Sequence, residues 1–495
     1  MRFLLVILLF LNINLFFAQD ASKVESLDNM IVKGMEDWKI PGLATIVVKD
    51  GQVVFKKTYG VRNIDNKEAV DGETLFNMAS TTKAIVAMAL GILVDQGRLN
   101  WDDKVQQYLP DFKLSDNYIA ADARVGDLLT HNLGVGNADM LWIMDSLSTK
   151  ETLKKFRYAK TTYPLRGGFE YQNLMYAVAG KVIEAVSGKP WTIFVDENIF
   201  APLGMDRSQT KSVDILKVGN YVSPHFNEDG KAVKVKHTFT DQIGAAGMIW
   251  SSIDDIEKYL QFILNEGKFD GKTIISKNTF QTLFEPKVIL NSNGRYPTNA
   301  LTNPNFNTYA YGWFQQDYRG KKLNFHTGSL FGLIAIAGVM PEENMAVYVF
   351  ANMDHAELRH AIMYKALDLF GFDDDSRDWH DEVFKLYSGF KQMQTISENS
   401  FNQSRVKDTK PTLKLDAYEG EFSNEMLGTF KIQLKNGKLY GNMNELLEFG
   451  LDHWHYNTFM TEKMEKLREK FPVVFQISGN GNVSEVEIAG ETFTR

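Results

Sequence analysis

Hydrophobic and polar residues near the start of the chain are spaced in a way that predicts a helix followed by a β-hairpin. Residues 24–38 place apolar side chains at helical intervals, and Pro41-Gly42 ends the pattern. Two short apolar runs, 43–48 and 53–57, flank Asp50-Gly51, a pair typical of tight hairpin turns. The folded part of the chain therefore opens with one helix and two paired strands.

The rest of the first 370 residues shows helical patterns between strand patterns. A long middle section is mainly helical, most clearly over 81–96 and 173–187. Strand patterns return over 322–339 and 346–351, before a helical pattern over 356–369. Because strands come from both ends of this region, we expect an α/β fold with one antiparallel sheet flanked by helices and a helical subdomain beside it.

A change in amino-acid composition near residue 375 predicts a second domain. Residues 373–375 begin a charged stretch and 397–410 contain almost no apolar residue, so we expect a linker over 376–411. Short strand patterns then flank Asn436-Gly437 and the glycine-rich turn at 479–481. The chain is thus divided into a main domain over 19–375 and a small all-β, barrel-like domain over 412–495.

The first 18 residues are typical of an export signal. Arg2 supplies positive charge, residues 3–17 are apolar except for Asn12 and Asn14, and Ala18 fits the last residue removed. A membrane anchor is the alternative, but the apolar run is short for crossing a bilayer. No later stretch has the length and apolarity of a transmembrane helix, so we expect an exported, periplasmic or secreted protein.

The amino-acid composition argues against several classes of function. The net charge of −8 offers no broad attraction for phosphate backbones, so nucleic-acid binding is a poor hypothesis. The chain has no cysteine, which excludes disulfides, thiolate metal sites and a cysteine nucleophile. Of the nine histidines, His355 and His360 do not have the four-residue spacing of a helical zinc pair. We therefore expect neither a metal nor another cofactor.

The segment Ser80-Thr81-Thr82-Lys83, just before an apolar helix, is a candidate for nucleophilic chemistry. At the first turn of that helix, Ser80 and Lys83 would share one face, and the Ser80 N–H would lack a helical partner. A serine hydroxyl needs a base, and a lysine serves as one only where burial or positive neighbours lower its pKa. Alone this pattern is weak, because a capping serine followed by a solvated lysine looks the same.

Two further segments strengthen the hypothesis. Tyr171 and Asn173 are two residues apart at the start of a helix, so both side chains can point the same way. A phenol can move protons, and an amide can orient Lys83 or a substrate carbonyl. On a late strand, 326–329 read His-Thr-Gly-Ser: Gly328 would allow close approach of a ligand, and the Ser329 amide could join that of Ser80 as an oxyanion donor.

These three motifs, in this order and rough spacing, resemble the penicillin-recognising serine hydrolases, specifically the class C β-lactamase-like branch. Residues 128–134, 202–205 and 246–248 are similar to further segments of that family, and the likeness extends over about 25–370. It implies an α/β sandwich with a helical subdomain. The module after about residue 412 is similar to the lipocalin-like domain often appended in this branch.

The resemblance also implies roles for the motif residues. Ser80 is the expected nucleophile, Lys83 and Tyr171 the groups that share proton transfer, and Asn173 their support. His326, Thr327, Gly328 and Ser329 are expected on the substrate side. His326 stands where true β-lactamases usually carry lysine, and a neutral imidazole offers a carboxylate no fixed charge.

The protein is therefore expected to be a serine hydrolase of ester, amide or peptide carbonyls, of esterase or D-amino-acid-directed peptidase type. Hydrolysis of β-lactams ranks below these activities. The expected partner is a small-molecule, peptide-linked or glycan-linked acyl substrate. The alternative is a non-catalytic sensor or binding protein that captures acyl compounds in the same cleft or binds through the C-terminal module. Whether Tyr171 or Lys83 is the acylation base, and the oligomeric state, are left open.

Overall fold

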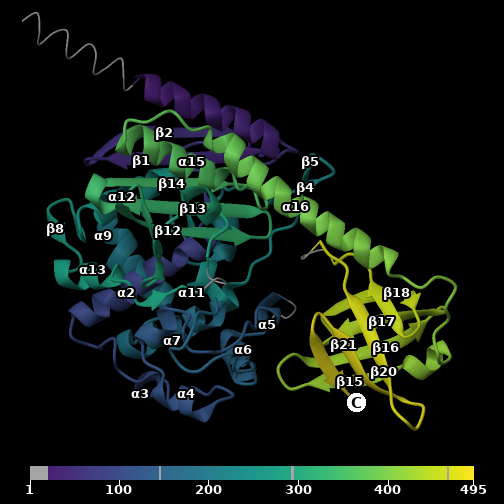
Figure 1. The fold of residues 1–495 in the computed structure, drawn as a ribbon. Helices are drawn as coiled ribbons and strands as arrows, with labels where there is room; N and C mark the ends of the chain where they lie inside the picture. The colour runs from purple at the N-terminus through teal and green to yellow at the C-terminus, as the bar shows by residue number, and fades with distance from the viewer. Residues whose placement is uncertain (1–20, 144–146, 291–294, 465–467) are drawn as a thin grey trace, which may run out of the picture.

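A computed structural model describes residues 21–143, 147–290, 295–464 and 468–495. The predicted export signal over 1–18 lies outside the described residues. The described chain forms a mixed α/β unit followed by an all-β barrel (Figure 1), which confirms the predicted fold class.

The centre of the first unit is an eight-stranded antiparallel sheet in the order β2-β1-β14-β13-β12-β11-β10-β9. Its hairpin β1–β2 turns at Asp50 and Gly51, which have φ values of 52° and 75°. The left-handed backbone explains why this Asp-Gly pair marks the turn. The strands are β1 (Gly42–Lys49), β2 (Gln52–Gly60), β9 (Val288–Ile289), β10 (Asn307–Tyr309), β11 (Phe314–Tyr318), β12 (Lys321–Leu330), β13 (Leu333–Met340) and β14 (Met345–Ala351).

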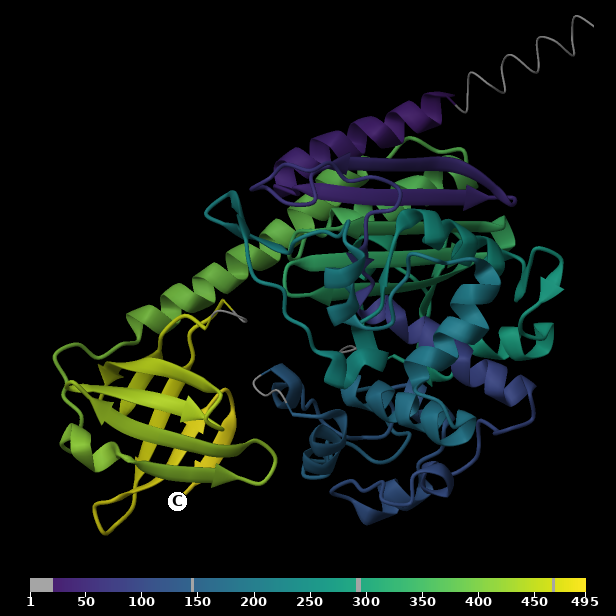
Figure 2. The ribbon, with the colours of Figure 1, turned by 180° about the vertical axis from the view of Figure 1, so that it is seen from behind.

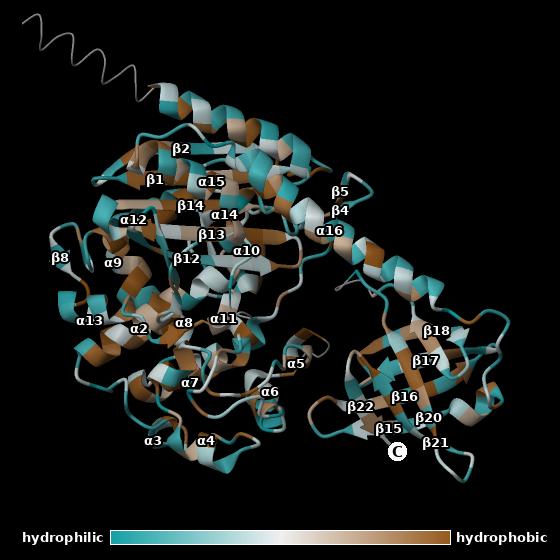
Figure 3. Ribbon diagram, viewed as in Figure 1, coloured by the Kyte–Doolittle hydropathy of each residue, from teal (hydrophilic) through white to brown (hydrophobic). Residues whose placement is uncertain are grey.

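Helices cover both faces of the sheet, because its inner strands are apolar on both sides. In β14, Val347 and Val349 pack toward the helix over 21–38 and α15 (Leu358–Ala366), whereas Tyr348 and Phe350 pack toward α2 (Thr82–Asp95) and α12 (Ile253–Leu264). Figure 3 shows β13 and β14 coloured mainly as hydrophobic.

The remaining helices form the subdomain beside the sheet or lie within the segments that surround the sheet (Figures 1 and 2). The longest, α7, covers Asn173–Ser187, as the sequence pattern predicts. The others are α3 (Val105–Tyr108), α4 (Asn117–Asp122), α5 (Met140–Ile143), α6 (Thr149–Phe156), α8 (Trp191–Val195), α9 (Ala201–Leu203), α10 (Ile215–Val218), α11 (Gly244–Gly247), α13 (Lys277–Leu283) and α14 (Asn299–Thr302). Three two-stranded pieces complete the unit: β3 (Phe76–Asn77) with β6 (Trp250–Ser251), β4 (His225–Glu228) with β5 (Lys231–Lys234), and β7 (Lys268–Phe269) with β8 (Lys272–Thr273).

A long helix connects the two units. We expected a linker over 376–411, and most of that stretch is α16 (Trp379–Gln403), which runs from the sheet to the barrel in both views (Figures 1 and 2). Its buried residues, Trp379, His380 and Val383, lie in its first two turns. From Phe390 onward the helix is exposed, and its apolar residues there, Phe390, Met393, Ile396 and Phe401, lie three to five positions apart.

The C-terminal unit is a closed barrel of eight antiparallel strands, with phenylalanines filling much of its interior. The barrel contacts the first unit: Glu228 of the β4–β5 hairpin pairs with Lys463 at 3.3 Å and with Arg468. The strands are β15 (Gly420–Asn424), β16 (Gly428–Lys435), β17 (Lys438–Met443), β18 (Leu447–His455), β19 (Thr458–Thr461), β20 (Pro472–Ile477), β21 (Val483–Ile488) and β22 (Glu491–Thr494). Among the described helices, none is long and apolar enough to cross a membrane.

Candidate active site

Ser80 lies in a strained turn between β3 and α2. The turn is a single 3-10 turn over Ala79–Thr81, where we expected the first turn of the α-helix itself. Ala79 has φ of +45°, a conformation that costs a non-glycine residue about 1–3 kcal/mol. Its N–H donates to Asn77 Oδ1 at 2.8 Å, and the Met78 N–H donates to the Ile249 carbonyl at 2.8 Å. These bonds hold the half-buried Ser80 at the head of α2.

Lys83 is fully buried one helical turn after Ser80. Its Nζ lies 3.0 Å from Ser80 Oγ, 2.8 Å from Asn173 Oδ1 and 2.7 Å from the Ala246 carbonyl oxygen. Burial lowers the pKa of Lys83 to about 7, although the Asp139 carboxylate acts to raise it. The neutral amine is therefore well populated at neutral pH.

The three partners of Lys83 determine what its neutral form can do. The Asn173 amide oxygen and the Ala246 carbonyl can only accept hydrogen bonds, so they take the two N–H groups of a neutral amine. The lone pair is then left for the hydroxyl of Ser80. Asn173 is itself oriented by Asp139, whose carboxylate oxygens accept from its Nδ2 at 3.2 and 3.1 Å.

Tyr171 lies beside this pair. The Lys83 ammonium is 5.0 Å from the centroid of the Tyr171 ring. Burial holds the pKa of Tyr171 well above its ordinary value, and a hydrogen bond with Ser80 acts in the opposite direction. The phenol is therefore protonated at neutral pH.

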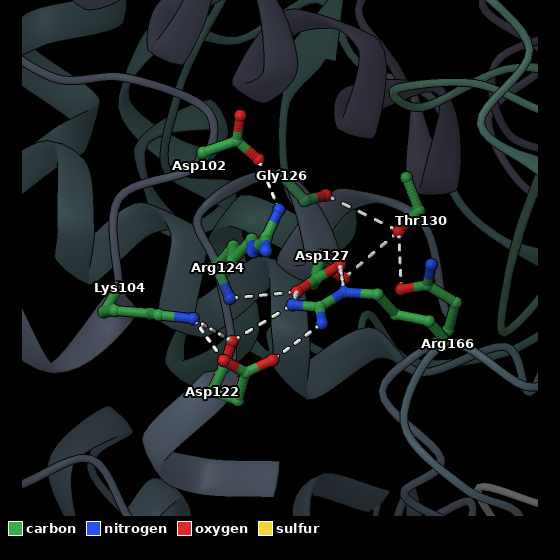
Figure 4. A network of polar contacts seen from close by, with 9 residues as sticks. Asp102, Lys104, Asp122, Arg124, Gly126, Asp127, Thr130 and Arg166 are labelled. Atoms are coloured by element: carbon green, nitrogen blue, oxygen red, sulfur yellow. Dashed lines mark hydrogen bonds and ion pairs between the residues drawn. The ribbon is translucent and has the colours of Figure 1, made fainter.

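A network of charged side chains fixes the loop that carries Tyr171 (Figure 4). The Arg166 guanidinium donates to Asp127 Oδ1 and Oδ2 at 3.0 and 2.6 Å and to Asp122 Oδ2 at 2.7 Å. The backbone of the loop is tied to the 131–132 segment, because Glu170 N–H donates to the His131 carbonyl at 2.9 Å. Together these contacts hold the segment that leads into Tyr171.

The Ser80 turn packs on one face of β12 at Gly328, next to the edge that β11 leaves free. Strand β11 pairs with β12 only as far as Phe325, and no other described strand pairs with residues 326–330 on that side. A Cβ at Gly328 would lie 2.4 Å from the Met78 carbonyl oxygen and 3.0 Å from Ser80 N. Only glycine allows this approach, which brings the Ser329 amide next to that of Ser80.

His326 is buried and both of its ring nitrogens are occupied. Nδ1 lies 2.7 Å from the Thr327 carbonyl oxygen, so it must carry the proton, and Nε2 then accepts from Tyr309 at 3.0 Å. Burial and the nearby Lys83 lower the pKa of His326 to about 3. Imidazole therefore supplies no positive charge here. The hydroxyl of Thr327 hydrogen-bonds to that of Tyr296.

The structure brings the predicted residues to one cleft of about 630 Å³, a volume typical of small-molecule sites. Ser80, Tyr171, Asn173, His326, Thr327 and Ser329 line it, while Lys83 and Gly328 lie just behind its wall. The other described residues that line the cleft are largely aromatic, and the charged ones among them are Asp139, Arg295, Asp354, His355 and Glu469.

Sequence reasoning missed three contributors. Asp139 and Tyr309 carry no motif of their own, and they matter only because they bind Asn173 and His326. Glu469 comes from the barrel, more than 380 positions after Ser80, so no local signal could have placed it in the cleft. Within the described ranges, no cluster of three or more histidine, aspartate or glutamate side chains is arranged to hold a metal ion.

Comparison with known proteins agrees with this fold. The solved structure of the octameric penicillin-binding protein homologue from Pyrococcus abyssi superposes with a TM-score of 0.63 at 22% identity, covering 95% of this chain and all of that one. At that identity the likeness concerns the fold. The C-terminal residues 404–494 match a domain of unknown function, DUF3471.

Two curated relatives align over much of the chain. Protein flp of Staphylococcus aureus (strain NCTC 8325 / PS 47) is 25% identical over 344 residues, 67% of this chain and 63% of its own length. The unguisins hydrolase ungD' of Aspergillus campestris is 25% identical over 414 residues, 79% of this chain and 74% of its own length. The family model described as Beta-lactamase matches residues 27–370, well over half of the chain, and the chain therefore belongs to the Beta-lactamase family.

Proposed function

We propose that this protein is a serine hydrolase that forms an acyl-enzyme on Ser80 with an ester, amide or peptide substrate. The observation that carries the proposal is a buried amine with a pKa of about 7, 3.0 Å from a half-buried serine hydroxyl. Membership of the Beta-lactamase family supports hydrolytic chemistry, as does the relative named as an unguisins hydrolase.

Acylation begins when neutral Lys83 accepts the hydroxyl proton as Ser80 Oγ bonds to the substrate carbonyl carbon. The carbonyl oxygen becomes an oxyanion beside the N–H groups of Ser80 and Ser329, which stabilise the charge. The bond to the leaving group then breaks, and the leaving group takes a proton from the Lys83 ammonium, directly or through the hydroxyl of Tyr171. Ser80 is left as an ester and Lys83 is neutral again.

Deacylation repeats these steps with water. Lys83 accepts a proton from water as the oxygen attacks the ester carbon, and the same two amides hold the second oxyanion. The ester bond breaks, Ser80 Oγ regains a proton from Lys83, and the acid product leaves. In both halves Lys83 is the base, because the raised pKa of Tyr171 keeps its phenol protonated at neutral pH.

We place esters and D-amino-acid-directed peptides ahead of β-lactams as substrates, because His326 stands where true β-lactamases usually carry lysine. A β-lactam carries a carboxylate, and His326, neutral and engaged on both nitrogens, cannot pair with it as a lysine would. The aromatic walls suit an apolar acyl or side-chain group. We also propose that the protein is exported, on the character of its first 18 residues; N-terminal sequencing of the mature protein tests this.

The test is intact-mass spectrometry of the full-length protein with a fluorophosphonate, a short p-nitrophenyl ester and a penicillin. We expect a covalent adduct on wild type that disappears in Ser80→Ala, whereas the exposed α16 variant Ser397→Ala is labelled like wild type. Ester adducts should decay with release of acid. An adduct of equal yield on Ser80→Ala would refute the nucleophile, and a stoichiometric ester adduct that never decays would favour an acyl-capturing sensor.

A further inference from the structure

A buried ion pair lies behind the strand that carries Ser329. Arg359 and Glu357 are 4% and 5% exposed. Arg359 Nε and Nη2 donate to Glu357 Oε2 and Oε1 at 2.9 and 3.0 Å, a two-pronged contact that fixes the guanidinium plane. Buried ion pairs are seldom more stabilising than apolar residues of the same volume, so stability alone does not account for this one.

The remaining guanidinium nitrogen faces the backbone of β12 and β13. Nη1 donates to the Gly328 carbonyl, to the Ala335 carbonyl at 3.2 Å and to Ser329 Oγ at 3.0 Å. Gly328 and Ala335 lie opposite each other in the sheet. One nitrogen can reach both carbonyl oxygens only if both point into the gap between the strands, because carbonyls on the two outer edges would be too far apart.

The direction of the Gly328 carbonyl fixes the direction of the next amide. The Gly328 C=O and the Ser329 N–H belong to one trans peptide unit, in which they point opposite ways. The Ser329 N–H therefore points toward the other edge of β12, where β11 has ended and the cleft lined by Ser80 and Ser329 opens. That is the side on which an oxyanion beside Ser80 would form.

We propose that Arg359 is a positioning residue for the oxyanion site: it holds and polarises the Gly328–Ser329 peptide so that the Ser329 N–H donates to the developing negative charge. A cation bound at the carbonyl end of a peptide draws electron density from it, which makes the N–H at the other end a stronger donor. Glu357 keeps Nη1 aimed at the carbonyl. The inference rests on the acyl-enzyme chemistry proposed for Ser80.

The test compares an oxygen ester with its thiono analogue, in which C=S replaces the reacting C=O, on the full-length protein. Sulfur is a larger and weaker acceptor, so a thiono ester gains less from oxyanion donors. We expect kcat/KM for the p-nitrophenyl oxygen ester to fall about 10-fold in Arg359→Lys and about 100-fold in Arg359→Met. For the thiono ester kcat/KM should fall much less, and KM for the oxygen ester should change little.

Arg319→Met is the matched control, because Arg319 also pairs with carboxylates, Asp368 at 3.1 Å and Asp374 at 2.9 Å, but does not line the cleft. This variant should keep the wild-type ratio of kcat/KM for the oxygen ester to kcat/KM for the thiono ester. Glu357→Gln keeps the guanidinium but removes the carboxylate that aligns it. We therefore expect the ratio of kcat/KM for the oxygen ester to that for the thiono ester to fall by a smaller factor than in the Arg359 variants. This variant serves as the test if Arg359→Met does not fold.

Equal losses for both esters in Arg359→Lys, or an unchanged oxygen-ester rate, overturns the role of Arg359 while leaving the hydrolase proposal intact. A wild-type protein that never forms an ester adduct on Ser80 contradicts the hydrolase proposal and this inference with it. The mass measurement therefore separates the two failures.

Discussion

Replacing Gly328 by alanine tests the close contact between β12 and the Ser80 turn. The added methyl carbon would lie 2.4 Å from the Met78 carbonyl oxygen, 2.8 Å from Ala79 Cβ and 3.0 Å from Ser80 N. Two of these neighbours are backbone atoms, so no side-chain rotation relieves the clash. The strand and the turn must separate by about 1 Å to restore ordinary contacts.

That separation pulls the Ser329 amide away from the Ser80 amide. A misplacement of about 1 Å costs about 100-fold in rate, and loss of one oxyanion donor costs about 10²–10³-fold. We therefore expect kcat/KM of Gly328→Ala to fall about 100-fold, or about 2.7 kcal/mol of transition-state stabilisation. The loss should appear in kcat, because the amide acts mainly on charge that develops during the reaction.

The assay is steady-state hydrolysis of a p-nitrophenyl ester, with thermal unfolding measured in parallel. Gly389→Ala provides a matched control, since a Cβ there would meet no atom within 4 Å and Gly389 lies inside the helix α16. It should keep full activity and gain slightly in stability. A Gly328→Ala protein with an intact unfolding transition and less than about a threefold loss of kcat/KM would refute the reasoning.

Three further predictions concern the proton acceptor. Since Lys83 has a pKa of about 7 and acts when neutral, kcat/KM should rise with pH to a plateau with a midpoint near pH 7; a profile flat from pH 5 to 9 contradicts this. Asp139→Asn removes the carboxylate that raises the pKa of Lys83, so the rising limb should move to lower pH, while Asp229→Asn, exposed and outside the lining of the cleft, leaves it in place. Lys83→Arg should lose about 10²–10⁴-fold in kcat, because a guanidinium keeps its proton, and retained activity would remove Lys83 from the mechanism.

Local signals in the sequence determined much of the fold. Helix α7 begins at Asn173 and ends at Ser187, as its spacing indicates, and β1–β2 turns at Asp50-Gly51. Such features follow from periodicity and turn chemistry within a few residues. The linker expected over 376–411 overlooked a helical spacing of apolar residues, at Val383, Tyr387, Phe390 and Met393, which indicates α16.

The chemistry of the site depended on the tertiary structure. The sequence identified Ser80, Lys83, Tyr171 and the segment from His326 as residues that belong together, through their order and resemblance to a family. It could not give the pKa of Lys83 or the neutral state of His326, because burial by distant segments produces both shifts. Nor could it find Asp139, Arg359 or Glu469, since each reaches the site from an element whose local sequence carries no sign of it. Residue types and spacing are properties of the chain, whereas desolvation and the direction of a peptide dipole exist only once the sheet, the helices and the barrel are packed together.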